Sequence, residues 1–283
     1  MGKRILVAIP IVIVVALAVI LQGWVLALFA VLLAVFCGYE IVHAMNQGKK
    51  PVLGGLSIGL SVFLAGWFLL AYGGIVGVEP FALLLAFIIY TMLCFVVAMF
   101  SSKHSMESVT NSVFAMIYPN LFWMIFYWMI LTGQGGYTGM LLLLLMVFVP
   151  AMFCDTAAYF FGSAFGRHKL CPAISPKKTV EGSIGGFVGG VVGAGVVYLV
   201  LSLYMKTFGA QITLPALPVM LLWGAVLAAV SQIGDLAASF IKRSLNIKDF
   251  GKILPGHGGI LDRMDSILFC IPVVYLFAIT MMA

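Results

Sequence analysis

Long apolar runs, separated by short polar or glycine-rich breaks, make up most of this 283-residue chain. A helix needs roughly 20 apolar residues to cross about 30 Å of hydrocarbon. Division of the chain at its breaks predicts nine helices, over residues 5–22, 24–45, 52–72, 80–100, 112–132, 139–161, 183–205, 214–241 and 260–282. The sequence therefore predicts an all-α, polytopic integral membrane protein.

The composition excludes several other classes of protein. Hydrophobic residues make up 64% of the chain and charged residues only 8%, whereas about a quarter of a soluble domain is charged. A soluble enzyme, a secreted disulfide scaffold and a disordered chain are therefore excluded. The net charge of +6 is spread too thinly along the chain to form a nucleic-acid groove, so we expect membrane lipids and no nucleic acid as partners.

The placement of Lys and Arg predicts the orientation, because cytoplasmic loops of membrane proteins hold an excess of both. With nine helices and the N-terminus in the cytoplasm, only Lys206 lies outside. The other fourteen basic residues are then cytoplasmic: Lys3, Arg4, Lys49, Lys50, Lys103, Arg167, Lys169, Lys177, Lys178, Lys242, Arg243, Lys248, Lys252 and Arg263. The odd number of helices places the C-terminus outside.

Charge is also uneven along the chain. Six of the nine acidic and ten of the fifteen basic residues lie between Asp155 and Asp265. We therefore expect scaffold helices over residues 1–111, middle helices and a basic cytoplasmic loop over 112–182, and C-terminal helices with the chemistry over 183–283. The active site is expected at the cytoplasmic side of these C-terminal helices.

Two polar groups precede the densest one. Asp155 and Tyr159 share a helix face, and an ionisable residue in a membrane helix usually faces a polar cavity or a partner; an interfacial aspartate is the alternative. Lys177 and Lys178 stand in a loop just before a helix, where basic side chains and helix N–H groups can meet a polyphosphate. An ordinary positive-inside loop explains the two lysines equally well.

The densest polar group lies on the last two predicted helices. Ser231, Asp235, Ser239 and Lys242 form one polar stripe through an apolar segment, and Asp262 and Asp265 lie one turn apart. Carboxylates on two helices can hold a hard divalent cation such as Mg²⁺. Since neighbouring residues on a helix do not pair readily, Arg263 is not expected to neutralise Asp262. A metal ion is therefore the expected partner of Asp235 and Asp262, with Asp265 as a third ligand.

Residues between these two helices add features that suit phosphate. Glycines in Gly256-His257-Gly258-Gly259 allow backbone to approach a phosphate before a helix start, and His257 by itself is weakly informative. Cationic side chains come from Lys242, Arg243, Lys248 and Arg263. A buried ion-pair network between two helices is the structural alternative. It accounts for one pair but not for this density of charge in so apolar a chain.

These residues resemble the signature of the phosphatidate cytidylyltransferase family, whose members are also called CDP-diacylglycerol synthases. The likeness lies in Ser239-x2-Lys242-Arg243-x4-Lys248-Asp249-x5-Pro255-Gly256-His257-Gly258-Gly259-x2-Asp262-Arg263-x-Asp265. Two upstream blocks are similar to the same family, Asp155-Thr156-x2-Tyr159 and Ser175-Pro176-Lys177-Lys178-Thr179-x-Glu181-Gly182. The resemblance covers about the last 130 residues in detail, and the rest by hydropathy and length.

The resemblance implies a multi-pass enzyme of the bacterial inner membrane that joins CTP and phosphatidic acid to give CDP-diacylglycerol and pyrophosphate. It implies Mg²⁺, with K⁺ as an optional companion, and is compatible with a homodimer. Catalytic roles are expected for Asp235, Asp262, Asp265, Lys242 and Arg243, of which the three aspartates would bind metal. Substrate-binding roles are expected for Asp155, Lys177, Lys178, Ser239, Lys248, His257, Gly258, Gly259 and Arg263.

Three other functions stay open at this stage. A CTP-dependent polyprenol kinase or an archaeal-type lipid cytidylyltransferase would use a similar CTP site on another lipid. A cation transporter would place carboxylates within the membrane, usually with inverted repeats and broken helices near the midplane. The length of the last motif argues against the first two, and the gathering of polar groups at one membrane face argues against the third.

Overall fold

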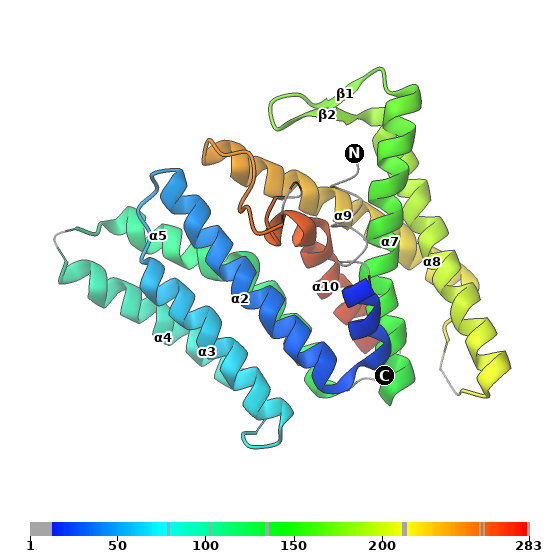
Figure 1. The fold of residues 1–283 in the computed structure, drawn as a ribbon, viewed down its shortest axis with the longest axis horizontal. Coiled ribbons are helices and arrows are strands. Elements are labelled where there is room, and N and C mark those ends of the chain that lie inside the picture. Colours follow the sequence, from blue (N-terminus) through cyan, green and yellow to red (C-terminus); the bar gives the residue numbers. More distant parts are fainter. Residues whose placement is uncertain are drawn as a thin grey trace. The chain divides into compact units, whose positions relative to one another are not determined.

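The computed structural model describes residues 13–77, 80–101, 103–133, 136–210, 214–254, 256 and 258–281. It confirms the all-α membrane-protein class, since these residues are almost entirely helical (Figure 1). The helices, with one π-helical segment (η1), are α2 (Gly23–Gln47), α3 (Gly54–Tyr72), α4 (Pro80–Met99), α5 (Met106–Ala115), η1 (Met116–Leu121), α6 (Phe122–Thr132), α7 (Gly136–Phe165), α8 (Val180–Phe208), α9 (Leu217–Ser244) and α10 (Leu261–Met281). Two short strands, β1 (Lys169–Cys171) and β2 (Ser175–Thr179), connect α7 to α8.

Each predicted segment overlaps helical structure in its described part, although the ends differ. The narrow break expected near Gln22 is real: residues 13–21 are helical, and Gln22 and Gly23, the first residue of α2, then take positive φ angles of 48° and 53°. The segment predicted over 112–132 starts earlier, at Met106, and runs through α5, η1 and α6. The chain is kinked within η1: Tyr118 has non-helical φ and ψ angles of −116° and 114°. Pro119, which follows it, has no backbone N–H and cannot continue an α-helical ladder.

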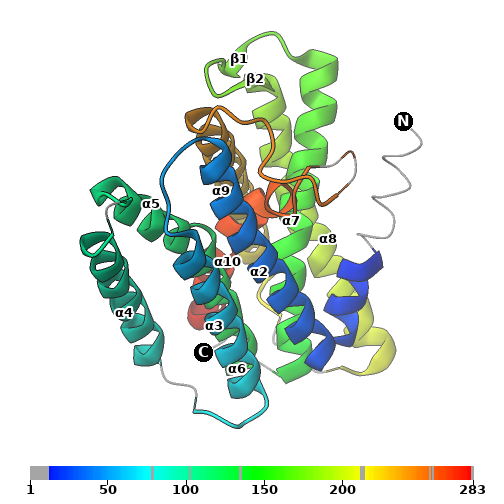
Figure 2. The same cartoon turned by 60° about the vertical axis from the view of Figure 1, so that its left-hand side comes forward.

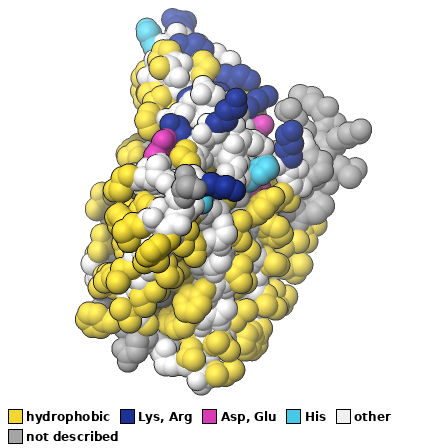
Figure 3. All heavy atoms as spheres, turned by 90° about the vertical axis from the view of Figure 1, so that its left-hand side faces the viewer, with side chains coloured by type: hydrophobic (Ala, Val, Ile, Leu, Met, Phe, Trp, Pro, Cys, Tyr) yellow, Lys and Arg dark blue, Asp and Glu magenta, His cyan; other side chains and the backbone are white. Residues whose placement is uncertain are grey.

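Seven helical stretches of the described chain are long and apolar enough to cross a membrane. They are Gly23–Gln47, Gly54–Tyr72, Met106–Thr132, Gly136–Phe165, Val180–Phe208, Leu217–Ser244 and Leu261–Met281, and a shorter apolar stretch, Leu84–Met99, lies in α4. Hydrophobic side chains cover much of the surface seen in Figure 3, as lipid-facing helices require. The chain is therefore a multi-pass membrane protein, and the count of nine spans stays a prediction.

The chain forms two compact units. Unit 1 contains Met1–Leu131 and Lys242–Arg263, and unit 2 contains Thr132–Ile241 and Met264–Ala283. The three segments expected from the distribution of charge stay a prediction. The last residues of α9 and the first turn of α10 belong with the N-terminal helices rather than with the C-terminal ones.

In unit 1, α2 and α3 run side by side in both ribbon views (Figures 1 and 2). A buried polar link joins three of its helices: the Tyr90 hydroxyl lies 2.8 Å from Ser57 Oγ and donates to the Ser112 carbonyl at 3.0 Å. Apolar side chains such as Leu60 and Met116 pack around this link. Unit 1 therefore has a core of its own.

In unit 2, the C-terminal half of α7 and the N-terminal half of α8 lie side by side (Figures 1 and 2). Small residues make this close approach possible: a side chain at Gly189 would overlap Ala157 and the Phe153 carbonyl. Such small-residue interfaces are typical of membrane helix pairs. The loop between the two helices is an antiparallel hairpin in which Lys169 pairs with Thr179. Thr179 then caps α8 by accepting from Gly182 N at 3.1 Å.

Candidate active site

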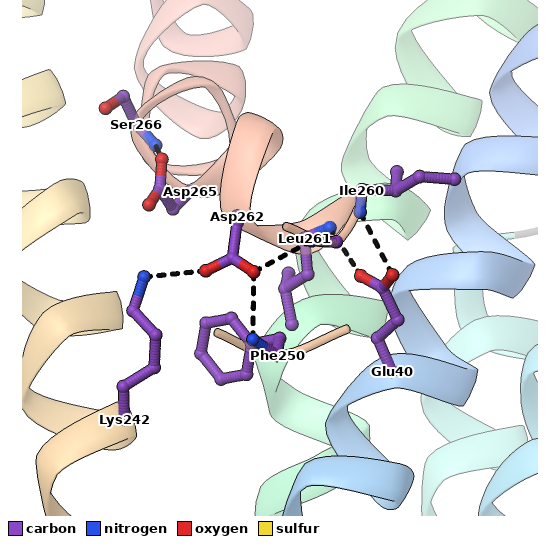
Figure 4. A network of polar contacts seen from close by, with 9 residues as sticks. Glu40, Lys242, Phe250, Ile260, Leu261, Asp262, Asp265 and Ser266 are labelled. Atoms are coloured by element: carbon purple, nitrogen blue, oxygen red, sulfur yellow. Dashed lines mark hydrogen bonds and ion pairs between the residues drawn. The ribbon is translucent and has the colours of Figure 1, made fainter. Parts of the chain in front are cut away.

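Asp262 is the best-connected of the predicted site residues. It lies in the first turn of α10 and is only 7% exposed. One oxygen, Oδ1, lies 2.7 Å from Lys242 Nζ at the end of α9. The other, Oδ2, accepts hydrogen bonds from Phe250 N at 2.8 Å and Gly259 N at 3.0 Å (Figure 4). We call these four residues the Asp262 centre.

The ion pair with Lys242 corrects one premise of the sequence argument. An unpaired Asp262 was expected to need a metal ion, but the ammonium group of Lys242 already supplies the positive charge. The side chains are 13% and 3% exposed, so both charges are largely removed from water, and removal of either would leave the other uncompensated. Lys242 also lies over the Phe250 ring, 5.2 Å from its centroid, where a cation is attracted to the face of the ring.

A second buried carboxylate supports the same loop. Glu40, on α2, is 1% exposed and accepts from Ile260 N at 3.0 Å and Leu261 N at 2.7 Å (Figure 4). Added side chains at Gly251 and Gly259 would both overlap its carboxylate. The three N–H groups at the start of α10 thus bond to carboxylates of the chain itself. The phosphate role expected for Gly258 and Gly259 stays a prediction.

Two further motif residues of unit 1, Lys248 and Asp249, line a polar cavity of about 320 Å³. His43 and Gln47 of α2 form one wall, and Lys248, Asp249 and Lys252 of the loop after α9 form another. Two lysines in one cavity suit an anionic ligand. Arg243 and Arg263 are exposed, and His257 lies outside the described residues.

Unit 2 holds the other predicted carboxylates. Asp235, on α9, forms an ion pair of 2.6 Å with Lys178 of β2, and the two side chains are 31% and 25% exposed. Residues alternate across a strand, so Lys177 points away from this pair and is exposed. The two lysines therefore differ in environment, although the sequence treats them alike.

Asp155 of α7 and Asp265 of α10 both accept hydrogen bonds from Ser266, in the first turns of α10 within unit 2. Asp155 Oδ2 accepts from Ser266 Oγ at 3.3 Å, and Asp265 Oδ1 accepts from Ser266 N at 2.8 Å. Asp265 is buried, Asp155 is exposed on α7, and Ser239 is half-buried on α9. Asp155 of α7 therefore lies beside the first turns of α10 inside this unit, and its substrate-binding role stays a prediction.

A metal site formed by the protein alone requires several His, Cys, Asp or Glu side chains close to one another. In the described part of the chain, no three His, Cys, Asp or Glu side chains group closely enough to hold a metal. Carboxylate oxygens are nevertheless the ligands that Mg²⁺ prefers, and Mg²⁺ usually takes one or two of them together with substrate phosphates. Asp235 and Asp262 carry carboxylates of this kind, and each is paired with a lysine of its own unit, Lys178 or Lys242. Their metal role, and that of Asp265, stays a prediction.

Glu40 is the site residue that the sequence argument missed. It lies in the segment assigned to scaffold, more than 200 positions from the loop that it holds. The sequence does contain one indication of its importance: Glu40 is the only acidic residue between Met1 and Val78. A lone carboxylate inside an apolar membrane helix is itself an indication of function.

The different environments of the two lysines lead to a prediction. Lys178→Ala removes the partner of Asp235 and should lower kcat, whereas Lys177→Ala should only raise the KM for CTP, by about threefold, as loss of one exposed phosphate contact would. Steady-state kinetics of the two purified variants separate these effects. Wild-type kinetics in both would favour an ordinary positive-inside loop.

Comparisons with known proteins show the family of the chain. Residues 2–281 match the model of the Cytidylyltransferase family. A protein of Staphylococcus haemolyticus (strain JCSC1435) named phosphatidate cytidylyltransferase is 33% identical over 265 residues, which cover 93% of each chain. Proteins of the same name from Staphylococcus saprophyticus and Staphylococcus aureus (strain N315) are 42% and 40% identical over 131 residues, or 46% of each chain. The chain belongs to the cytidylyltransferase family.

Proposed function

We propose that this protein transfers the cytidylyl group of CTP to phosphatidate, giving CDP-diacylglycerol and pyrophosphate. The observation that carries the proposal is the 33% identity to a phosphatidate cytidylyltransferase over 93% of both chains. The residues that the proposal needs form an organised, charged and largely buried centre around Asp262. The seven membrane-length helices suit an enzyme whose acceptor is a lipid.

The reaction is a displacement at phosphorus. A phosphate oxygen of phosphatidate attacks the α-phosphorus of CTP, and the bond from that phosphorus to the bridging oxygen breaks, so pyrophosphate leaves. Such transfers depend on positioning and charge stabilisation rather than on covalent catalysis. Lys248 and Lys252 line a cavity able to hold anionic phosphate groups, and Lys242 is fixed by Asp262.

Mg²⁺ is the proposed cofactor, with K⁺ as an optional companion. When bound, Mg²⁺ would neutralise charge on the phosphates of CTP. Asp235, Asp262 and Asp265 are its candidate ligands because their carboxylates are the hard oxygen donors that it prefers. A homodimer stays a prediction.

The direct test supplies purified protein with CTP, Mg²⁺ and one of three acceptors: phosphatidate, a polyprenol or an archaeal-type ether-lipid acceptor. Mass spectrometry of the extracted lipid should find CDP-diacylglycerol with phosphatidate and little product with the other two. A phosphorylated polyprenol would instead favour the kinase, and a cytidylylated ether lipid would favour the archaeal-type enzyme. Uptake of a cation into vesicles without any lipid product would favour a transporter.

We also propose that the N-terminus is cytoplasmic, in a bacterial inner membrane. Within unit 1, Lys50 pairs with Glu107 at 3.2 Å, and Gly48 packs closely against Leu245. The contact between Gly48 and Leu245 brings the connection after α2, which contains Lys50, close to the connection after α9, which contains Lys248. Within unit 2, Lys177 and Lys178 lie in the hairpin before α8, and Lys206 lies in its last turn. This separation of basic residues supports the orientation inferred from the positive-inside rule.

The orientation predicts the side of the C-terminus. Because nine spans carry the chain from inside to outside, alkaline phosphatase fused after Ala283 should be active, and a green fluorescent protein at the same place should be dark. A fluorescent fusion with inactive phosphatase would contradict either the odd count or the orientation. Fusions in the hairpin between α7 and α8 should give the opposite pattern and serve as the control.

A further inference from the structure

We infer that Glu40 is a positioning residue of this enzyme: it holds the loop before α10 against α2 and so fixes the geometry of Asp262. The inference rests on the proposed function only for its effect on turnover. No hydrogen bond or ion pair joins Glu40 to Asp262 or Lys242, and its hydrogen bonds go to the backbone of the loop, at Ile260 N and Leu261 N.

The surroundings of Glu40 are unusual for a buried carboxylate. It makes no ion pair among the described residues, and both of its hydrogen bonds come from backbone N–H groups, those of Ile260 and Leu261. Burial of a carboxylate without compensation costs several kcal/mol. The compensation here comes from the two N–H donors and from the positive end of the α10 dipole. The carboxylate and the start of α10 therefore stabilise each other.

Glu40 and Asp262 accept hydrogen bonds from different backbone N–H groups of the loop before α10 and of its first turn. Glu40 accepts from residues 260 and 261, and Asp262 accepts from Phe250 and Gly259. Four backbone groups on both sides of the loop thus depend on two adjoining carboxylates (Figure 4). If Glu40 released its two N–H groups, the first turn of α10 would lose its attachment to α2, and Asp262 lies in that turn.

The glycines of the loop provide independent support. Neither Gly251 nor Gly259 has room for a side chain, because the Glu40 carboxylate lies against both residues. The space is thus shaped for this carboxylate rather than filled by apolar packing. Gly251 also lines the polar cavity that contains Lys248.

Glu40→Gln tests the inference with minimal change in size. An amide oxygen can accept one of the two N–H groups, but the amide NH₂ then faces the other, and donor meets donor. We expect kcat to fall about 100-fold, as a displacement of about 1 Å at a catalytic group can cause. KM for CTP should change little, and Glu40→Asp should recover part of the loss because it restores two acceptor oxygens.

Hydrogen exchange gives a readout that does not depend on activity. Amides of residues 259–261 should exchange about tenfold faster in Glu40→Gln than in the wild type. Glu107→Gln is the matched control: it removes a carboxylate from the same unit, but one that is 54% exposed and paired with Lys50 at the surface. It should leave both the exchange of these amides and kcat unchanged.

A second variant covers the case in which Glu40→Gln does not fold. Gly251→Ala presses a methyl group against the Glu40 carboxylate from the other side of the loop and should give the same two effects. Gly66→Ala, on α3, is its control, since a side chain there meets open space.

The outcomes separate this inference from the proposed function. Unchanged exchange at residues 259–261 in both test variants would overturn the holding role. Faster exchange with wild-type turnover would overturn the positioning role. A wild-type protein that forms no CDP-diacylglycerol would overturn the proposed function, while the exchange data would still decide whether Glu40 holds the loop.

Discussion

Asp262→Asn should lower turnover by at least about 100-fold, the loss typical of removing a preorganised charged group from an active site. The substitution keeps the size of the side chain, and its oxygen can still accept from Phe250 N and Gly259 N. Its NH₂ group, however, then faces the ammonium of Lys242. Because the pair is largely buried, the uncompensated lysine should also cost about 3–5 kcal/mol of stability.

A double variant separates catalysis from stability at this centre. Lys242→Met combined with Asp262→Asn removes both charges, so the free energy of unfolding should recover, as it often does when a buried pair is replaced as a whole. Thermal melting in detergent measures this recovery, and the turnover of the folded protein is measured in parallel. We expect stability to return and activity to stay lost. A double variant that is both stable and active would show that the pair is structural.

Asp235→Asn should also lower turnover by about 100-fold or more, but with little loss of stability. Its pair with Lys178 is about one-quarter to one-third exposed, and such pairs contribute only about 0–1 kcal/mol. Melting temperatures and activity as a function of Mg²⁺ concentration distinguish the two effects. The Mg²⁺ concentration for half-maximal activity should rise if Asp235 is a ligand.

The exposed pair of Lys50 and Glu107 offers a control for Asp235→Asn. Glu107→Gln removes a carboxylate from a comparable surface ion pair and should keep normal turnover. Normal turnover and an unchanged Mg²⁺ requirement in Asp235→Asn itself would end the metal role of this residue.

The sequence predicts the helices well because each must bury its own backbone hydrogen bonds in lipid, which requires long apolar runs. The boundaries are less accurate, since helices continue past the apolar core. The segment predicted over 183–205 extends to Val180–Phe208, and that over 139–161 extends to Gly136–Phe165. The hairpin of β1 and β2 is too short and too polar to give a strand pattern, and Pro176 argues locally against one.

The roles of the candidate site residues stay predictions, and only part of their connections could be expected from the sequence. The charged motif and its likeness to one family identify Asp262 and Lys242, but spacing along two helices does not reveal that they pair with each other. Asp235 pairs with Lys178, and the backbone N–H groups at the start of α10 bond to Glu40. Both partners are far away in sequence. Such long-range contacts depend on tertiary packing, which neither periodicity nor composition encodes.

The most direct measurement of the central claim follows two phosphorus labels of CTP into products. With purified protein and phosphatidate, label at the α-phosphate should enter the lipid as CDP-diacylglycerol, and label at the γ-phosphate should leave as pyrophosphate. Asp262→Asn should lose both signals together. Transfer of the γ-label to lipid would contradict the account, because it would show a phosphoryl-transferring kinase, and an absence of either labelled product from the wild-type protein would contradict it as well.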